Sequence, residues 1–229
     1  MSVSGGPNLS EDGLVLLLDA ANIKSYPTTG TAWTDLSGNN IIGALTNGPT
    51  FSGDRAGTIV FDGTDDFILT NYTPTVGTGN LTYVCWFKTS VSQTTGLIGF
   101  RAASPSFIQS VLVMSATNLY MSSFDGVTNR EVATTSAWTD GRWHCAVMVH
   151  TSTSDTVYVD GVYQTQITSA AQNITNIQPL LIGGLANSNQ LLSGWGFNGS
   201  IAIAQVYNKS LSATEILQNF NAQRSRFGV

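Results

Sequence analysis

Charged side chains are scarce in this sequence. Lys, Arg, Asp and Glu make up 10% of the 229 residues, and the formal net charge is −5. The nine Lys and Arg residues are scattered singly from Lys24 to Arg226. Because no basic stripe is present to neutralise phosphates, the sequence predicts no nucleic-acid partner. For the same reason it predicts no binding to an anionic membrane surface.

Cysteines and long apolar runs are also rare. The two cysteines, Cys85 and Cys145, each lie within an apolar run, at the centre of an expected strand. These positions favour two small buried core residues, and a disulfide between them is the alternative. No apolar run reaches the length of a membrane span. The segment Met1–Asp12 lacks the basic and apolar parts of a signal peptide, so we expect a chain that is made without a conventional export signal.

Residue patterns typical of hydrolases are missing as well. The only glutamates, Glu11, Glu131 and Glu215, fall in an expected arm, loop and helix cap. Retaining glycosidases need two carboxylates about 5–5.5 Å apart, and no expected strand carries two acids on one face. A carboxylate pair assembled from different strands is the remaining alternative. His144 and Cys145 point to opposite faces of one strand, which prevents a catalytic dyad. We therefore expect no enzymatic activity.

Short apolar segments separated by Gly, Ser, Thr, Asn and Gln dominate the sequence. Leu81–Lys88 and Arg142–His150 alternate so that every second residue shares one face, as in a β-strand. Asp160-Gly161 lies between two such segments and predicts a tight hairpin turn. Many short strands joined by turns indicate a sandwich or a barrel.

One helix is expected near the C-terminus. Ser212 and Glu215 match a capping box, in which each side chain binds a free backbone N–H at the helix start. The apolar spacing that follows predicts a helix from about Ala213 to Ala222. The side chains expected to be buried against a sheet are Ile216, Leu217 and Phe220.

Four aspartates are candidate calcium ligands. Asp62, Asp65 and Asp66 crowd one turn, and Asp19 ends the first expected strand. Calcium prefers several oxygen ligands, which such a group can supply. The alternative, which we prefer, is a turn in which Asp62 caps backbone N–H groups. We therefore expect no cofactor, and calcium at these four residues if any ion is bound.

A second candidate site surrounds one tryptophan. Trp195 lies in an expected loop with Asn187, Asn189 and Gln190. Exposed aromatic rings flanked by amides are typical of carbohydrate-binding sites. The alternative is that Trp195 covers one end of the core.

Five stretches, in order along the chain, resemble the laminin-G-like, concanavalin A-like jelly-roll family. They are Gly13–Ala20, Ile59–Ile68, Thr82–Phe87, Asp140–Val149 with Val157–Gly161, and Gly199–Ile216. The resemblance implies an all-β fold over residues 13–229: a two-sheet antiparallel jelly-roll sandwich with one short C-terminal helix. The polar sequence of residues 1–12 predicts a flexible arm before this domain. It also implies a scaffold for binding glycans or proteins, often with structural calcium. Where many members have an Asp-Glu pair in the last strand, this chain has Ala202 and Ile203.

The tail Tyr207–Val229 is similar to the endings of laminin-G-like domains in structural proteins of tailed bacteriophages. This similarity implies a non-catalytic virion protein: a capsid decoration, a head fibre or a tail-fibre-associated adhesion module. We expect such a protein to be located in the virion, to form homo-oligomers with other virion proteins as partners, and to bind host surface polysaccharide. The alternatives are a free lectin-like carbohydrate-binding protein and, less favoured, a polysaccharide hydrolase or lyase.

Overall fold

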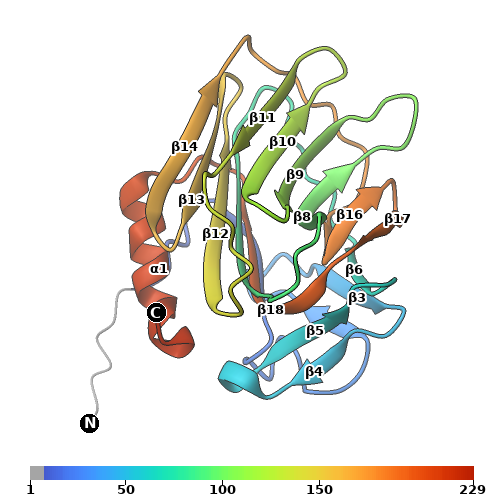
Figure 1. The fold of residues 1–229 in the computed structure, drawn as a ribbon, viewed down its shortest axis with the longest axis vertical. Coiled ribbons are helices and arrows are strands. Elements are labelled where there is room, and N and C mark those ends of the chain that lie inside the picture. The colour runs from blue at the N-terminus through green and yellow to red at the C-terminus, as the bar shows by residue number, and fades with distance from the viewer. Residues whose placement is uncertain (1–7) are drawn as a thin grey trace.

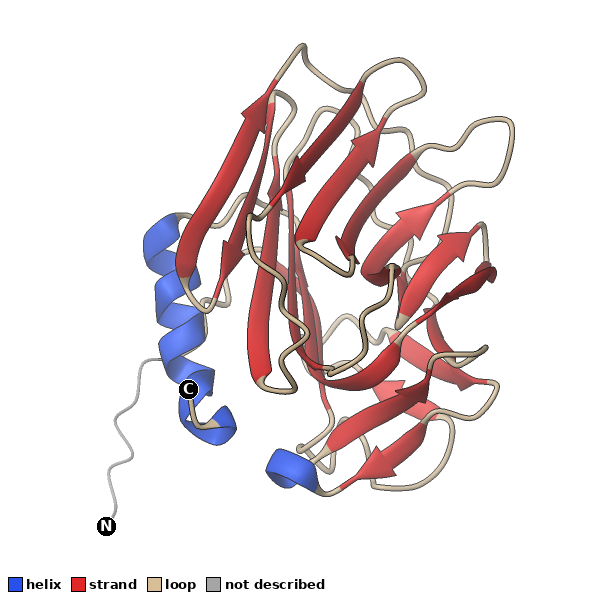
Figure 2. Ribbon diagram, in the orientation of Figure 1, coloured by secondary structure: helices blue, strands red, loops and turns tan. Residues whose placement is uncertain are grey.

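The computed structural model describes residues 8–229, which form a β-sandwich with one C-terminal helix (Figures 1 and 2). Two antiparallel sheets of eight strands each pack face to face, and a two-stranded hairpin lies beside them. The helix α1 (Ala213–Phe227) covers the outer face of the first sheet. This arrangement confirms the predicted all-β fold. No helix in the described part of the chain is long and apolar enough to cross a membrane.

The first sheet has the order β14-β13-β12-β7-β18-β5-β4, and β1 also pairs with β18. The first half of β18 pairs with β5 and its second half pairs with β1, so β18 joins these short strands to the centre of the sheet. The strands are β1 (Leu14–Asp19), β4 (Thr50–Ser52), β5 (Thr58–Asp62), β7 (Leu81–Lys88), β12 (Trp143–His150), β13 (Ser154–Val159), β14 (Val162–Thr168) and β18 (Asn198–Tyr207).

The second sheet has the order β11-β10-β9-β8-β15-β6-β3-β2. Its strands are β2 (Ala32–Thr34), β3 (Ile42–Thr46), β6 (Phe67–Thr70), β8 (Thr95–Arg101), β9 (Gln109–Met114), β10 (Leu119–Phe124), β11 (Asn129–Ala133) and β15 (Leu181–Ile182). The separate hairpin consists of β16 (Gly184–Asn187) and β17 (Gln190–Gly196), and the short 3₁₀ helix η1 spans Asp54–Ala56.

Strand alternation gives the first sheet two buried faces. In β7, Cys85 and its alternate neighbours belong to the core between the sheets, whereas Trp86 lies under α1. Cys85 pairs with Ala146 in the ladder and Cys145 pairs with Trp86, so the two thiols lie on opposite faces of the sheet. Both cysteines are buried and free, as the core interpretation predicts. Side chains that point apart in this way cannot form a disulfide.

The helix α1 begins at the predicted capping box. The Glu215 backbone N–H donates to Ser212 Oγ (3.3 Å), and the Ser212 N–H donates to the Glu215 carboxylate (2.8 Å). The predicted end at Ala222 was wrong, because the helix continues to Phe227 and stops at Gly228, whose φ of +75° is left-handed. No strong helix breaker occurs between these two positions.

The buried face of α1 also differs from the prediction at one position. Leu217 was expected to be buried, but 47% of its surface is exposed. Ile216 and Phe220 are buried as predicted, and Phe227 is buried with them, at the i, i+4 and i+11 positions that share one helix face. The Phe227 ring stacks on Trp86 with a centroid distance of 4.0 Å.

The flexible arm predicted for residues 1–12 includes residues 1–7, which lie outside the described residues. The rest of the predicted arm contacts α1. The Ser10 N–H donates to Asn219 Oδ1 (2.8 Å), and Gln218 donates to the Asn8 carbonyl (2.7 Å). Lys209 forms an ion pair with Asp12 (2.6 Å). Residues 8–12 are therefore joined to the domain by polar contacts.

A buried ionic network joins the two sheets. Asp155 on β13 and His150 on β12 belong to the first sheet, and Arg130 on β11 belongs to the second; all three side chains are fully buried. The Asp155 carboxylate lies 3.3 Å from Arg130 and 2.6 Å from His150 Nδ1. Arg130 also donates to Ser169 Oγ at 2.7 Å. Ionisable side chains from β11, β12 and β13 therefore contact one another between the two sheets.

Candidate functional site

A groove of about 250 Å³ lies on the outer face of the second sheet, beside the β16–β17 hairpin. In β9, Leu112 and Met114 point into the core between the sheets, so Val111 and Val113 point outward into the groove. Figure 1 shows β8 next to this hairpin, with β9, β10 and β11 following in order away from it. The groove is thus formed by residues that are up to 94 positions apart in the chain, from Arg101 to Trp195.

One part of the groove is aromatic and aliphatic. Tyr120 from β10 and Trp195 from β17 are half-buried and pack against Val111, Val113 and Leu185. Burial raises the pKa of Tyr120, and the neighbouring Glu131 carboxylate raises it further. The phenol therefore remains protonated, and its hydroxyl can donate a hydrogen bond to a ligand.

The other part of the groove is polar. The ladder aligns Arg101 on β8 with Gln109 on β9, and it aligns Ser122 on β10 with Glu131 on β11. Gln109 Nε2 donates to Ser122 Oγ at 2.6 Å. A guanidinium, an amide, a hydroxyl and a carboxylate thus lie beside two aromatic rings.

The hairpin is held against β8 by close backbone packing. A Cβ at Gly96 would overlap the Gly184 carbonyl oxygen and lie 2.7 Å from the Gly184 carbonyl carbon. The buried Thr95 hydroxyl donates to the Trp195 carbonyl (2.7 Å), and the Ser188 N–H donates to the Arg101 carbonyl (2.8 Å). These contacts at both ends of the hairpin position Trp195 over the groove.

Of the four residues predicted for carbohydrate binding, Trp195 lines the groove. Asn187, Asn189 and Gln190 lie at the turn between β16 and β17, where Asn187 pairs with Gln190. The structure describes all three of these residues, and none of them lines the groove. Sequence reasoning missed Tyr120, whose only signal was its outward position in an alternating strand.

The candidate calcium ligands are brought together only in part. The carboxylates of Asp62, Asp65 and Asp66 offer oxygen atoms within 4.8 Å of one another. Within this group the Asp62 N–H donates to Asp66 (3.0 Å), and Asp62 accepts from the Thr64 N–H (2.7 Å), which is the expected turn. Burial raises the pKa of Asp66, and the nearby Asp62 and Asp65 carboxylates raise it further.

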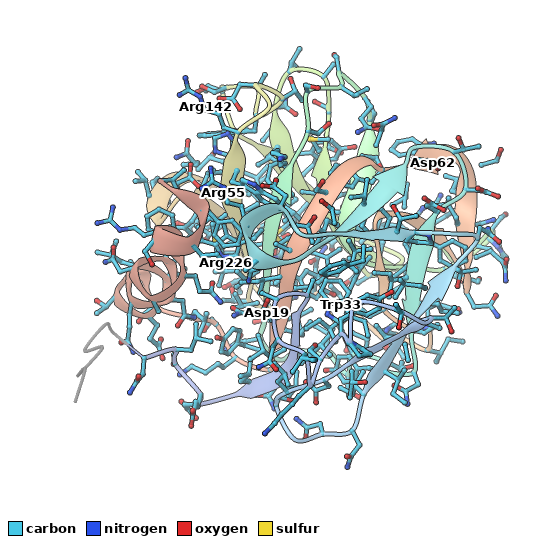
Figure 3. The ribbon with its side chains drawn as sticks, turned by 90° about the horizontal axis from the view of Figure 1, so that it is seen from below. Asp19, Trp33, Arg55, Asp62, Arg142 and Arg226 are labelled. Carbon is cyan, nitrogen blue, oxygen red and sulfur yellow. The ribbon has the colours of Figure 1, made fainter. Side chains whose placement is uncertain are left out.

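Asp19 lies apart from this turn (Figure 3). Asp19 pairs with Ile203 on β18 and Asp62 pairs with Asn198, five residues away on the same strand. That offset corresponds to about 16 Å along the strand. Asp19 instead forms an ion pair with Arg226 at 2.6 Å. The grouping of Asp19 with the three turn aspartates was therefore wrong.

Comparison with known proteins agrees with this architecture. A laminin-G family model, described as the concanavalin A-like lectin/glucanases superfamily, matches residues 61–217. The binding domain of Paraclostridial Mosquitocidal Protein 1 is similar, with 16% identity, a TM-score of 0.69 and coverage of 93% of this chain and 52% of that one. No curated protein sequence matches the chain.

Two further solved structures show the same likeness. The botulinum neurotoxin serotype D binding domain has 14% identity and a TM-score of 0.67, over 93% of this chain and 52% of that one. Trypanosoma rangeli sialidase in complex with sialic acid has 15% identity and a TM-score of 0.66, over 93% of this chain and 33% of that one. The chain thus spans about half or less of these structures, and the likeness establishes the fold alone. Since the family model covers more than half of its residues, the chain belongs to the concanavalin A-like lectin/glucanases superfamily.

Proposed function

We propose that this domain is a non-catalytic carbohydrate-binding module and that the groove beside the β16–β17 hairpin is its binding site. The observation that carries the proposal is the pairing of Trp195 and Tyr120 with polar side chains in one groove. The apolar face of a sugar ring packs on an aromatic ring, and its hydroxyls bind amide, hydroxyl and carboxylate groups.

Two further observations support this proposal. The botulinum neurotoxin DC binding domain, which is similar in fold, is described in a complex with SialylT, and the Trypanosoma rangeli sialidase is described with sialic acid. Glu131 is the one carboxylate among the described residues that line the groove. Most glycosidases act with two carboxylates, so the lining suits binding better than hydrolysis.

Replacing Trp195 or Tyr120 with alanine should weaken glycan binding by about tenfold or more, since each change removes an aromatic surface from the sugar. A glycan array would identify a ligand, and calorimetry would measure its affinity. Tyr163→Ala is the matched control, because this exposed tyrosine lies on β14 of the first sheet. Unchanged affinity in both groove variants would contradict the site, and release of reducing ends from the ligand would contradict a non-catalytic role.

We also propose that the chain is a structural or adhesion protein of a tailed-phage virion, where it assembles with other virion proteins. The similarity of residues 207–229 to phage laminin-G-like domains supports this setting. Quantitative mass spectrometry of purified particles should therefore detect the chain. A copy number close to that of the major capsid protein would indicate a capsid decoration, and a few copies would indicate a tail fibre. Absence from the particles would contradict the virion role and favour a free lectin.

A further inference from the structure

Arg101 is a half-buried arginine whose guanidinium forms no ion pair with any described residue. Four of the six arginines lie within 4.0 Å of a carboxylate: Arg55, Arg130, Arg142 and Arg226. Arg224 is exposed on α1. Arg101 is half-buried at the end of β8, and among residues 8–229 no side chain forms an ion pair with its guanidinium.

The surroundings of Arg101 remove water from this cation without supplying a negative charge. Arg101 Cζ lies over the Phe107 ring, 4.9 Å from the ring centroid, so an aromatic side chain occupies one side of the cation. Burial lowers the pKa of Arg101, although an arginine remains protonated at physiological pH. A partly desolvated cation is stabilised when a ligand anion replaces the lost water. The guanidinium can give two parallel hydrogen bonds to such an anion.

The negative charge of the groove lies at its opposite side. Glu131 is exposed on β11, and no described cation forms an ion pair with it. The strands β8 and β11 are separated by β9 and β10, which corresponds to at least about 14 Å at the usual strand spacing. Arg101 and Glu131 therefore cannot neutralise each other. An anionic ligand group is attracted at the β8 side and repelled at the β11 side.

We infer that the groove binds an acidic glycan and that Arg101 pairs with the carboxylate of one of its sugars. This inference rests on the proposed glycan-binding function and names the class of sugar that the site accepts. Trp195 and Tyr120 contact the sugar rings, Arg101 holds the carboxylate, and Glu131 accepts hydrogen bonds from hydroxyls at the other side. The protein's net charge of −5 disfavours anions in general, so the preference depends on this one cation.

The test uses matched glycans that differ only in charge, namely sialyllactose against lactose, and oligogalacturonate against its carboxyl-reduced form. In at least one pair the unmodified protein should bind the acidic member roughly tenfold more tightly, because a charge-assisted, two-point hydrogen bond is among the stronger polar contacts. Arg101→Gln should remove this difference while binding of the neutral member persists. Arg101→Lys should keep part of it, since lysine retains the charge but not the planar fork.

Arg142→Gln is the matched control, because it makes the same charge change at a side chain that is 80% exposed outside the groove. This variant should keep the preference, and circular dichroism should show that every variant is folded. Equal affinity for acidic and neutral members, with binding still lost in Trp195→Ala, would overturn the acidic-glycan inference and leave the carbohydrate-binding function standing. Loss of the preference in Arg142→Gln would assign it to overall charge and overturn the role of Arg101. Failure to bind any glycan would overturn both proposals.

Discussion

Replacing Asp155 with alanine should lower the free energy of unfolding by about 3–5 kcal/mol, because a buried cation loses its counter-charge. Arg130 and Asp155 are fully buried between the sheets, and the carboxylate lies 3.3 Å from the guanidinium. The same carboxylate accepts a hydrogen bond from His150, whose Nε2 has no hydrogen-bond partner within the described residues. Without Asp155, the guanidinium retains only neutral partners such as Ser169 and the Thr151 carbonyl.

Urea denaturation of the protein and its variants would measure this effect. Asp65→Ala is the control, since it removes an exposed aspartate; we expect a change within about 0.5 kcal/mol there. The double variant Arg130→Met with Asp155→Leu should recover much of the lost stability, because apolar side chains of similar size avoid the cost of burying charge. A loss below about 1 kcal/mol in Asp155→Ala would contradict a tightly coupled ionic network.

Gly96→Ala should weaken glycan binding by about a hundredfold, or about 2.7 kcal/mol, which exceeds the effect of either aromatic substitution. The added methyl group overlaps the Gly184 backbone, and backbone atoms cannot rotate away as a side chain can. The β16–β17 hairpin must therefore move away from β8 and take Trp195, Leu185 and Leu192 with it. Overpacking of this kind also destabilises a protein, typically by about 1–3 kcal/mol.

Calorimetry with the glycan identified on the array would measure the affinity, and thermal denaturation would confirm that the variant is folded. Gly53→Ala is the matched control, because a Cβ at Gly53 meets no atom within 4 Å and its φ of −74° suits alanine. This control should bind as tightly as the unmodified protein. If Gly96→Ala folds and binds normally, the hairpin does not form one side of the binding site.

The features that the sequence predicted correctly are local ones. Alternation in Leu81–Lys88 placed Cys85 in the core and Trp86 on the opposite face, where both lie. The capping box at Ser212 and Glu215 located the start of the helix, because its hydrogen bonds involve residues only three positions apart. The helix end was missed, and Leu217 was wrongly expected to be buried beside Ile216 and Phe220, since packing against Trp86 selects the buried face.

The binding site could not be derived in the same way. Trp195 could be singled out as an aromatic residue in a polar segment, but its partners Tyr120 and Arg101 are 75 and 94 residues away in the chain. Asn187, Asn189 and Gln190 are closer in sequence, yet they lie at the hairpin turn outside the groove lining. Proximity along the chain was therefore a poor guide to proximity in space.

The sequence by itself determined the all-β class, the helix start and the family, since these depend on residue periodicity, turn chemistry and short motifs. It did not locate every strand, because Glu131 and Trp195, both expected in loops, lie on β11 and β17. The tertiary structure alone decided which strands are neighbours and in what register they pair. That choice placed Arg101, Glu131 and Trp195 around one groove, buried Arg130 against Asp155, and separated Asp19 from the turn at Asp62. The physical reason is that alternation assigns a residue to a face of its own strand, whereas only packing of distant segments decides what covers that face.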